Sequence, residues 1–271
     1  MFKISRIVAF FLMFWLMPSQ ADVMVLVHGY QGVPDDWRVS GIAACLGDDG
    51  WEDAGVIDLS NTGEPVLPER VGPADNYLYT VKLPSEDPIL LQAQTLSLYL
   101  QSLAQRHAYE PLIVVGHSAG GVVARSALVR TAASLPVAQL ITIATPHLGT
   151  ALAEAGATVA KSPLAWVAPL LGGSTLYHSE QLFTDLMPER PGSLLFMLNR
   201  QPHPRIDYVS VVRREAYGLP GDLLVPRDSQ RLEHVYALRG LARSIDAGYG
   251  HQLQQDDGEV ILRVLNGQRY L

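Results

Sequence analysis

Ser118 is the residue of this 271-residue chain whose neighbours point most directly to chemistry. It lies in Gly116-His117-Ser118-Ala119-Gly120, which matches the pattern G-x-S-x-G. The pattern alone is weak, and it gains meaning only between a buried strand and a helix. A serine hydroxyl is also a poor nucleophile until a histidine takes its proton and a carboxylate orients that histidine. Ser118 is therefore a candidate nucleophile that needs two partners.

The two partners are expected in loops after later strands, because ligands of a doubly wound sheet sit at the carboxyl ends of its strands. Asp222 follows the apolar run 206–212, and His251 follows the run 234–238. The chain order Ser118, Asp222, His251 is one in which serine-aspartate-histidine triads occur. We therefore predict His251 as the base and Asp222 as the acid that orients it.

Other acids and histidines are less favourably placed. Asp228 is the main alternative acid because it lies close after Asp222. Asp207 opens a predicted strand, and Asp246 lies too close before His251 in the chain. The remaining histidine candidates precede or open strands, fall in a predicted insertion, or adjoin the serine and would point away from it; these are His107, His234, His178, His203 and His117.

Two backbone N–H groups are candidates to stabilise a negatively charged oxygen, as acyl transfer requires. The N–H of Ala119 follows the nucleophile directly and opens a helix. The N–H of Tyr30 lies in the turn Gly29–Gly32, which follows the first predicted strand at the same sheet edge. A plain tight turn is the alternative explanation of these glycines. We interpret His28 as a residue that holds this turn by hydrogen bonds.

Continuous apolar runs predict the strands that must position these residues. Runs without polar alternation suit parallel strands that are covered on both faces. Segments with helical spacing at 87–107 and 119–135 alternate with the strands, and in the first of them Ile89, Leu96, Leu100 and Leu103 form an apolar stripe. The prediction is an α/β fold with a doubly wound, mostly parallel sheet of about six strands. The predicted strands cover 23–27, 77–81, 112–115, 138–144, 206–212 and 234–238.

One segment, about 151–204, interrupts this alternation. It is rich in Leu, Trp and Pro, and we predict an insertion between two strands within a single domain that covers 22–271. The functional interpretation is a lid or cap over a pocket, and the alternative is additional core packing. Trp166, Leu170 and Leu171 fit either interpretation.

The N-terminus predicts export. Lys3 and Arg6 precede the apolar run 7–17, which Pro18 and a small-residue pattern ending at Ala21 follow. This predicts a secretory signal peptide, 1–21, and hence a periplasmic or secreted protein. A retained membrane anchor is less favourable because a spanning helix needs about 20 apolar residues.

The charge and the cysteine content limit the partners. The net charge is −7, and removal of the N-terminal segment would make the chain more acidic, which argues against nucleic acid as a partner. The single cysteine, Cys45, cannot form an internal disulfide. We expect no obligate protein partner.

Five stretches together resemble α/β-hydrolases of the bacterial lipase and esterase type: LVHGYQG, VVGHSAGG, TIATPHLGT, GDLLVP and GYGH. The resemblance implies the same assignments that the positions favour, with Ser118 as nucleophile, His251 as base, Asp222 as acid, and Tyr30 and Ala119 as oxyanion donors. It also implies a lid after the sixth sheet strand of the family and a small sheet that lacks the two leading strands.

Within this resemblance, the run Thr145–Gly149 is similar to a segment that shapes the pocket wall in many lipases, so His147 is not expected in the triad. The calcium sites and disulfides of some lipases have no recognisable counterpart, and no cofactor or metal is predicted.

The resulting hypothesis is hydrolysis of carboxylic esters with lipid-like acyl chains through an acyl-enzyme. The expected partners are a small-molecule or lipid ester and, transiently, a lipid surface. Acyltransferase, thioesterase and amidase activities are alternative hypotheses on the same scaffold. A binding protein that has this fold and no catalytic activity is a further alternative.

Overall fold

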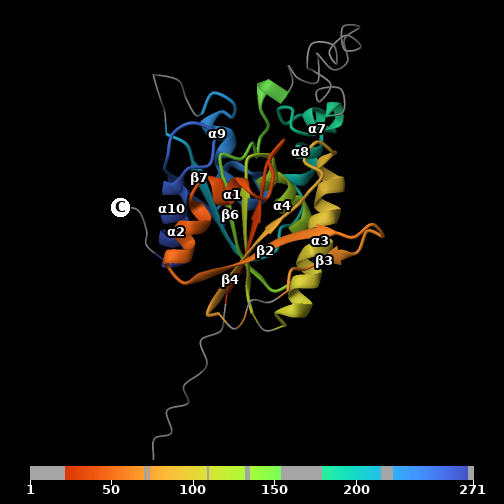
Figure 1. Cartoon of the computed structure of the whole chain (residues 1–271). Coiled ribbons are helices and arrows are strands. Elements are labelled where there is room, and N and C mark those ends of the chain that lie inside the picture. Colours follow the sequence, from red (N-terminus) through yellow and green to blue (C-terminus); the bar gives the residue numbers. More distant parts are fainter. Residues whose placement is uncertain are drawn as a thin grey trace, which may run out of the picture.

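The computed structural model describes residues 22–69, 72, 74–108, 110–131, 135–153, 179–214 and 222–267. The predicted signal peptide, 1–21, lies outside these ranges, as does the segment 154–178 with His178, Trp166, Leu170 and Leu171. The described residues form one central sheet with helices on both faces (Figure 1).

The sheet has eight strands in the order β3-β2-β4-β1-β5-β6-β7-β8. Neighbouring strands are parallel except for β2 and β3. The predicted fold class, a doubly wound and mostly parallel α/β sheet, is therefore confirmed, with eight strands in place of about six. The strands are β1 (Asp22–Val27), β2 (Trp51–Leu59), β3 (Pro65–Val66), β4 (Asn76–Val81), β5 (Leu112–His117), β6 (Val137–Ile143), β7 (Asp207–Val212) and β8 (Ala242–Asp246).

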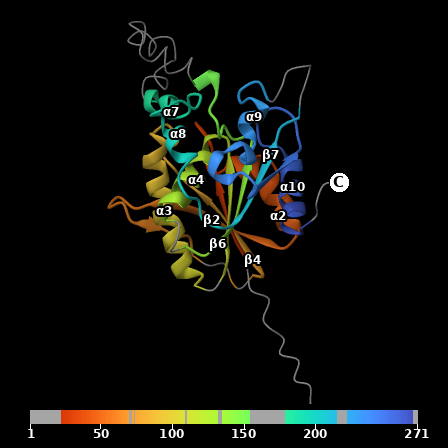
Figure 2. The ribbon, with the colours of Figure 1, turned by 180° about the vertical axis from the view of Figure 1, so that it is seen from behind.

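Two hydrophobic cores lie on the two faces of this sheet. Helices α3 (Ile89–Arg106) and α4 (Ala119–Thr131) cover one face, and α2 (Ile42–Asp48) and α10 (Gln255–Leu265) cover the other (Figures 1 and 2). Successive residues of β1 enter opposite cores, since Val25 packs with the first pair of helices and Leu26 with the second. This explains why the central strands are continuous apolar runs.

The apolar stripe predicted for the helix before the serine is confirmed. Ile89, Leu96, Leu100 and Leu103 of α3 are fully buried. Leu91 and Leu98, on the opposite side of the helix, are 46% and 43% exposed. The 3.6-residue period therefore identified the face that packs against the sheet.

The predicted strand 234–238 is wrong. These residues lie in two 3₁₀ turns, η3 (Leu232–His234) and η4 (Tyr236–Leu238), and the last strand is β8. Val235 and Leu238 are buried, whereas Tyr236 is 60% exposed. The short apolar run packs against the sheet without joining it. The loop that follows the true strand still carries His251.

The strand β2 was not predicted, because its apolar residues do not alternate with polar ones in the two-residue period of a strand. Trp51, Ala54 and Ile57 are the buried apolar residues of this strand and recur at every third position. The pairing of β2 with β4 shifts register between Asp53 and Gly55, which is a bulge that interrupts the two-residue period.

The described part of the predicted insertion lies in the chain between β6 and β7. It contains α7 (Glu180–Asp185) and α8 (Leu194–Leu198), which lie at one end of the sheet (Figure 1). Leu182 and Leu195 are fully buried in the same core as α3 and α4. Within the described ranges, no helix has both the length and the apolar character of a membrane span.

Candidate active site

Ser118 lies in the turn between β5 and α4, as the pattern around it predicts. Its φ is 52°, in the left-handed region that side chains rarely adopt, and its N–H donates to the Ile143 carbonyl at 2.9 Å. Glycines permit this turn. A Cβ at Gly120 would lie 2.3 Å from the His28 carbonyl oxygen, and a Cβ at Gly116 would lie 2.6 Å from the Gly121 Cα. The glycines of the motif thus let β1, β5 and α4 approach closely.

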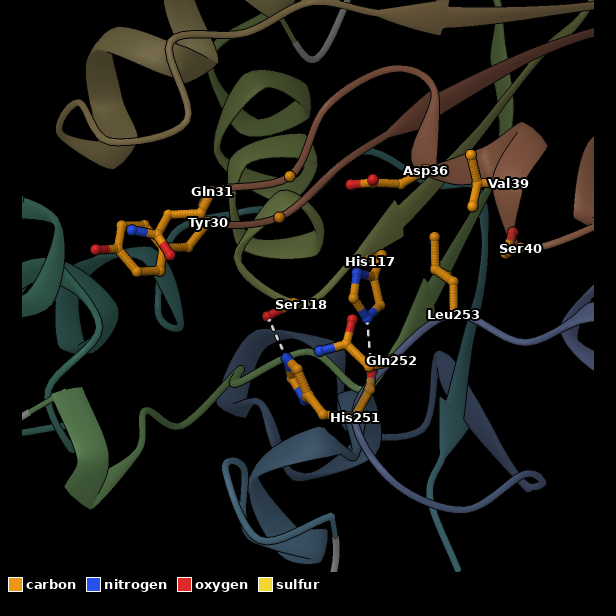
Figure 3. A pocket seen from close by; sticks show the side chains of 12 residues that line it. Tyr30, Gln31, Asp36, Val39, Ser40, His117, Ser118, His251, Gln252 and Leu253 are labelled. Atoms are coloured by element: carbon orange, nitrogen blue, oxygen red, sulfur yellow. Dashed lines mark hydrogen bonds between the residues drawn. The ribbon is translucent and has the colours of Figure 1, made fainter. Parts of the chain in front are cut away.

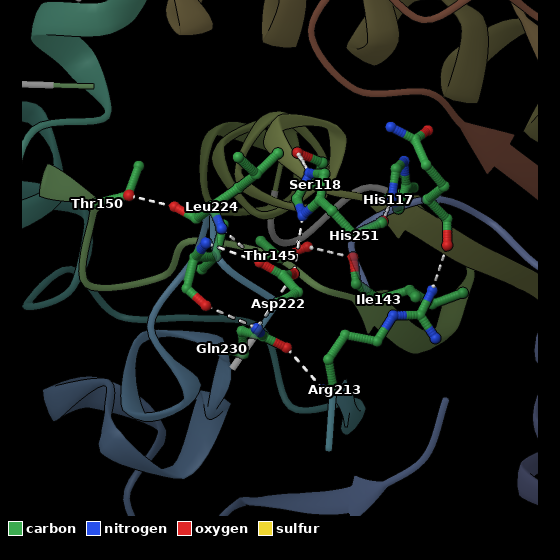
Figure 4. A network of polar contacts seen from close by, with 12 residues as sticks. His117, Ser118, Ile143, Thr145, Thr150, Arg213, Asp222, Leu224, Gln230 and His251 are labelled. Atoms are coloured by element: carbon green, nitrogen blue, oxygen red, sulfur yellow. Dashed lines mark hydrogen bonds and ion pairs between the residues drawn. The ribbon is translucent and has the colours of Figure 1, made fainter. Parts of the chain in front are cut away.

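A continuous chain of hydrogen bonds connects the three predicted residues (Figure 4). His251 Nδ1 contacts Asp222 Oδ2 at 2.8 Å, and His251 Nε2 contacts Ser118 Oγ at 2.8 Å. A carboxylate accepts, so Nδ1 carries a proton; in the neutral tautomer with this proton, Nε2 is the acceptor that faces the serine hydroxyl. The structure brings these residues together across 29 and 133 positions of sequence.

The Asp222 carboxylate is held from several sides, and the residue is only 5% exposed. Its Oδ1 accepts from the N–H groups of Leu224 at 3.0 Å and Val225 at 2.7 Å. Its Oδ2 also accepts from Gln230 Nε2 at 3.3 Å. These donors fix the carboxylate, and its Oδ2 contacts the imidazole ring of His251.

His117 contacts the backbone of His251, the predicted base. Its Nε2–H donates to the His251 carbonyl oxygen at 2.7 Å. Burial lowers the pKa of His117 to about 4, so the ring is neutral near pH 7. The sequence predicted that this side chain would point away from Ser118. Nothing in the pattern indicated a contact with a carbonyl 134 positions later.

A buried ion pair supports the same loop. Arg213, directly after β7, contacts Asp257 of α10 at 2.6 Å and donates to the Gln252 carbonyl at 2.9 Å. The Arg213 N–H donates to Gln230 Oε1 at 2.8 Å, so the network continues to the residue that contacts Asp222. Sequence reasoning missed these residues, because nothing in an arginine's neighbours identifies a buried partner.

The two predicted oxyanion donors lie beside Ser118. A Cβ built on Gly29 would lie 2.8 Å from Ser118 Cβ, so the turn that carries Tyr30 packs directly against the serine. Among the described residues, no acceptor bonds the N–H of Tyr30 or of Ala119. Both groups are therefore free to donate to a ligand atom near Ser118 Oγ.

His28 holds this turn, as the sequence predicted. Its Nε2 accepts from the Leu83 N–H at 3.1 Å, and its Nδ1–H donates to the Gly29 carbonyl at 3.1 Å. Burial lowers the pKa of His28, which keeps it neutral in this role.

The alternative acids lie elsewhere. The carbonyl of Asp228, in α9 (Arg227–Gln230), accepts from His234 Nδ1 at 3.1 Å, and the structure gives no contact between Asp228 and His251. The carboxylate of Asp246 pairs with Arg227 and Arg231. Asp222, and neither of these two acids, is therefore the carboxylate that contacts His251.

The other described histidines are also engaged away from Ser118. The buried ring of His147 contacts Thr142 Oγ1 at 3.0 Å, His107 contacts Tyr79 at 3.0 Å, and His203 donates to the Gln201 carbonyl at 2.8 Å.

Two cavities meet at Ser118. The first, of about 250 Å³, has mainly apolar walls, to which Leu152, Leu182, Phe183, Leu186 and Val225 contribute. The second, of about 520 Å³, opens on the other side of the serine, towards Asp36, His117 and Gln252 (Figure 3). His251 borders both cavities. A bound molecule whose reactive atom lies at Ser118 can thus extend in two directions. Within the described ranges, no group of three or more His, Cys, Asp or Glu residues is suited to hold a metal ion.

Comparison with known proteins shows similarity at the level of fold. Residues 91–160, which include β5 and Ser118, match the PGAP1-like alpha/beta domain. No curated protein matches the chain by sequence. The lin2722 gene product of Listeria innocua superposes with a TM-score of 0.66 at 15% identity, over 92% of this chain and 96% of that one.

Two further solved structures are a lipase and a lipase-esterase related protein. The propeptide form of Bacillus licheniformis lipase BlEst2 has a TM-score of 0.59 at 18% identity, over 93% of this chain and 51% of that one. The lipase-esterase related protein of Clostridium acetobutylicum has a TM-score of 0.52 at 10% identity, over 92% of this chain and 95% of that one. This chain therefore has the α/β-hydrolase fold.

Proposed function

We propose that this protein hydrolyses carboxylic esters through an acyl-enzyme formed on Ser118. The observation that carries the proposal is the hydrogen-bond chain from Asp222 through His251 to Ser118 Oγ. Ser118 borders both cavities. The fold supports ester hydrolysis in general, and this geometry supports the assignment of roles.

In the first half-reaction, Ser118 Oγ attacks the ester carbonyl carbon while its proton moves to His251 Nε2. Asp222 stabilises the imidazolium that forms. The N–H groups of Ala119 and Tyr30 donate to the oxygen that becomes negatively charged. Loss of one such donor costs about 10²–10³-fold in rate.

Collapse of the tetrahedral intermediate breaks the bond between the carbonyl carbon and the alcohol oxygen, and His251 gives its proton to that oxygen. The alcohol leaves, and the acyl group stays bonded to Ser118. His251 then takes a proton from water, whose oxygen attacks the acyl carbon. The bond between the acyl carbon and Ser118 Oγ then breaks, His251 returns its proton to Oγ, and the acid is released.

The acyl group is assigned to the apolar cavity. Leu182, Phe183 and Leu186 contribute from the region of α7, in the described part of the predicted insertion, and residues 182–186 act as a cap over the acyl chain. An apolar chain that leaves water gains free energy in proportion to its length, about 0.8 kcal/mol per methylene group. We therefore propose esters with lipid-like acyl chains as substrates, drawn from small molecules or from a lipid surface.

The proposal is tested with p-nitrophenyl esters from acetate to palmitate. We expect kcat/KM to rise from acetate to octanoate and activity to disappear in Ser118→Ala. Ser126→Ala is the matched control, because Ser126 is a buried serine of α4 that does not border either cavity. Ester hydrolysis that survives in Ser118→Ala would overturn the mechanism. A series in which acetate is the best substrate would overturn the acyl-chain preference.

We also propose that residues 1–21 direct export to the periplasm or the medium and are then removed. The support is the basic and apolar pattern of this segment. The mass of the protein isolated from an expressing bacterium tests this. A mature chain that begins at Asp22 is expected, and a chain that keeps residues 1–21 in the cytoplasm would contradict it.

A further inference from the structure

The larger cavity beside Ser118 differs in character from the apolar one. Its walls include the polar side chains of Gln31, Ser40 and Gln252, together with the carboxylate of Asp36 (Figure 3). Its volume is about 520 Å³, against about 250 Å³ for the apolar cavity. Gln31 and Gln252 border both cavities, whereas Asp36, Ser40 and His117 border the larger one and not the apolar one. The part of an ester that enters the larger cavity therefore meets a carboxylate that the apolar cavity does not offer.

Asp36 gives this cavity its charge. One carboxylate oxygen, Oδ2, accepts from the Val33 N–H at 2.8 Å, and within the described residues the other oxygen has no hydrogen-bond partner. The nearest arginine in the chain, Arg38, is engaged with Asp53 through two contacts of 2.7 Å. No lysine or arginine borders the cavity in the part of the chain that the structure describes.

Two histidines, His117 and His251, also border this cavity. His117 borders the cavity, and burial lowers its pKa to about 4, so its ring is neutral near pH 7. His251 contacts Asp222 through Nδ1 and Ser118 through Nε2, so both of its ring nitrogens are engaged. Among the described residues that line the cavity, Asp36 is the one acidic side chain.

An ester carbonyl at Ser118 has its acyl chain on one side and its alcohol on the other. With the acyl chain in the apolar cavity, the alcohol enters the polar one. We infer that the polar cavity is the alcohol site and that Asp36 makes it select alcohols that carry a positive charge, such as amino alcohols, over neutral and especially anionic ones. This inference rests on the proposed function and adds the class of leaving group.

The expected preference is modest because Asp36 is partly exposed to solvent. An exposed pair of opposite charges contributes at most about 1 kcal/mol, which corresponds to about fivefold in kcat/KM. Salt screens such a contact, so the preference shrinks as ionic strength rises above about 0.15 M.

The test compares three butyrate esters of similar shape with different alcohol charge. These are butyrylcholine, its neutral carbon analogue 3,3-dimethylbutyl butyrate, and the butyrate ester of 2-hydroxyethanesulfonate. The rates are corrected for non-enzymatic hydrolysis, and the readout is the ratio of kcat/KM between esters in one enzyme. We expect the cationic ester to exceed the neutral one by about two- to fivefold, and the anionic ester to be the poorest.

Asp36→Asn removes the charge and keeps an oxygen that accepts from Val33. We expect this variant to bring the cationic-to-neutral ratio close to one. Asp35→Asn is the matched control, because Asp35 is the adjacent acid and does not border the cavity. It removes the same charge from the chain, and its ratio should equal that of the wild type.

Three results would overturn the inference. The first is a wild-type ratio of one or below, and the second is an equal loss of preference in Asp35→Asn and Asp36→Asn. In both cases, hydrolysis of the neutral ester that depends on Ser118 would leave the proposed function standing. The third is a lack of turnover of all three esters, which would overturn the proposed function together with the alcohol site.

Discussion

The substitution Asp222→Asn is predicted to stop catalysis while the fold is retained, and the hydrogen bonds around Asp222 give the reason. Oδ1 accepts from two backbone N–H groups, those of Leu224 and Val225. An asparagine keeps both bonds only if its carbonyl oxygen takes this position. Its NH₂ group then occupies the Oδ2 position and faces His251 Nδ1 and the Gln230 amide group.

A donor in that position reverses the histidine tautomer. Nδ1 of His251 must then accept, so the proton moves to Nε2, which no longer accepts from Ser118. Loss of the correct tautomer in a triad of this kind costs about 10⁴ in kcat, or about 5.5 kcal/mol of transition-state stabilisation. The stability loss is smaller, because the two backbone contacts survive and one contact with Gln230 is replaced by two opposed donors, at about 1–3 kcal/mol.

The assay is the kcat for p-nitrophenyl butyrate, measured beside the thermal transition of each variant. Asp228→Asn is the control, because the sequence alone left Asp228 open as the alternative acid. We expect it to retain most of the wild-type kcat. Near-wild-type turnover in Asp222→Asn, or an equal loss in Asp228→Asn, would refute this reasoning about the acid.

Three more predictions concern the residues that support the site. His117→Phe removes the donor to the His251 carbonyl and should lower kcat by about ten- to a hundredfold, since the base shifts; His117→Gln, which can still donate, should lose less, and equal losses would argue against this role. The free energy of unfolding should fall by about 3 kcal/mol through His117 as the pH drops from about 6.5 to about 4, because in this range the unfolded state binds a proton at His117 and the folded state does not. Urea denaturation at several pH values measures this change. A free energy of unfolding that is constant or rises as the pH drops would contradict it. Gly120→Ala should unfold or inactivate the protein, because its Cβ would lie 2.3 Å from the His28 carbonyl oxygen. Gly47→Ala is the control: it lies in a helix with open space around it and should be neutral or stabilising by about 0.5–1 kcal/mol. Equal melting temperatures for the two variants would contradict the predicted steric clash at Gly120.

The sequence predicted the centre of the sheet better than its edges. Strands β1, β5 and β6 are buried on both faces, so their composition is unambiguous. The edge strand β8 is half polar, with Arg243 paired to Asp207 across the strands, and such a segment resembles a loop. The strand β2 was missed for a different reason, because its bulge gives the buried apolar residues a spacing of three in place of two.

The three residues of the candidate site were predictable from the glycine pattern around Ser118 and from the order of Ser118, Asp222 and His251 in the chain. The turn at Ser118 needs its glycines, and Asp222 and His251 follow strands whose ends meet at one sheet edge. The supporting contacts were not predictable. The bonds from His117 and Arg213 end on backbone carbonyls, those of His251 and Gln252, which leave no signature in the sequence.

Covalent capture of Ser118 tests the central claim most directly. The wild-type protein is incubated with a fluorophosphonate and analysed by intact mass spectrometry and peptide mapping. We predict a single adduct on Ser118, formed much more slowly in Asp222→Asn and absent in Ser118→Ala. A folded wild-type protein that remains unlabelled, or a Ser118→Ala variant that is labelled at the same rate, would contradict an activated serine at this position.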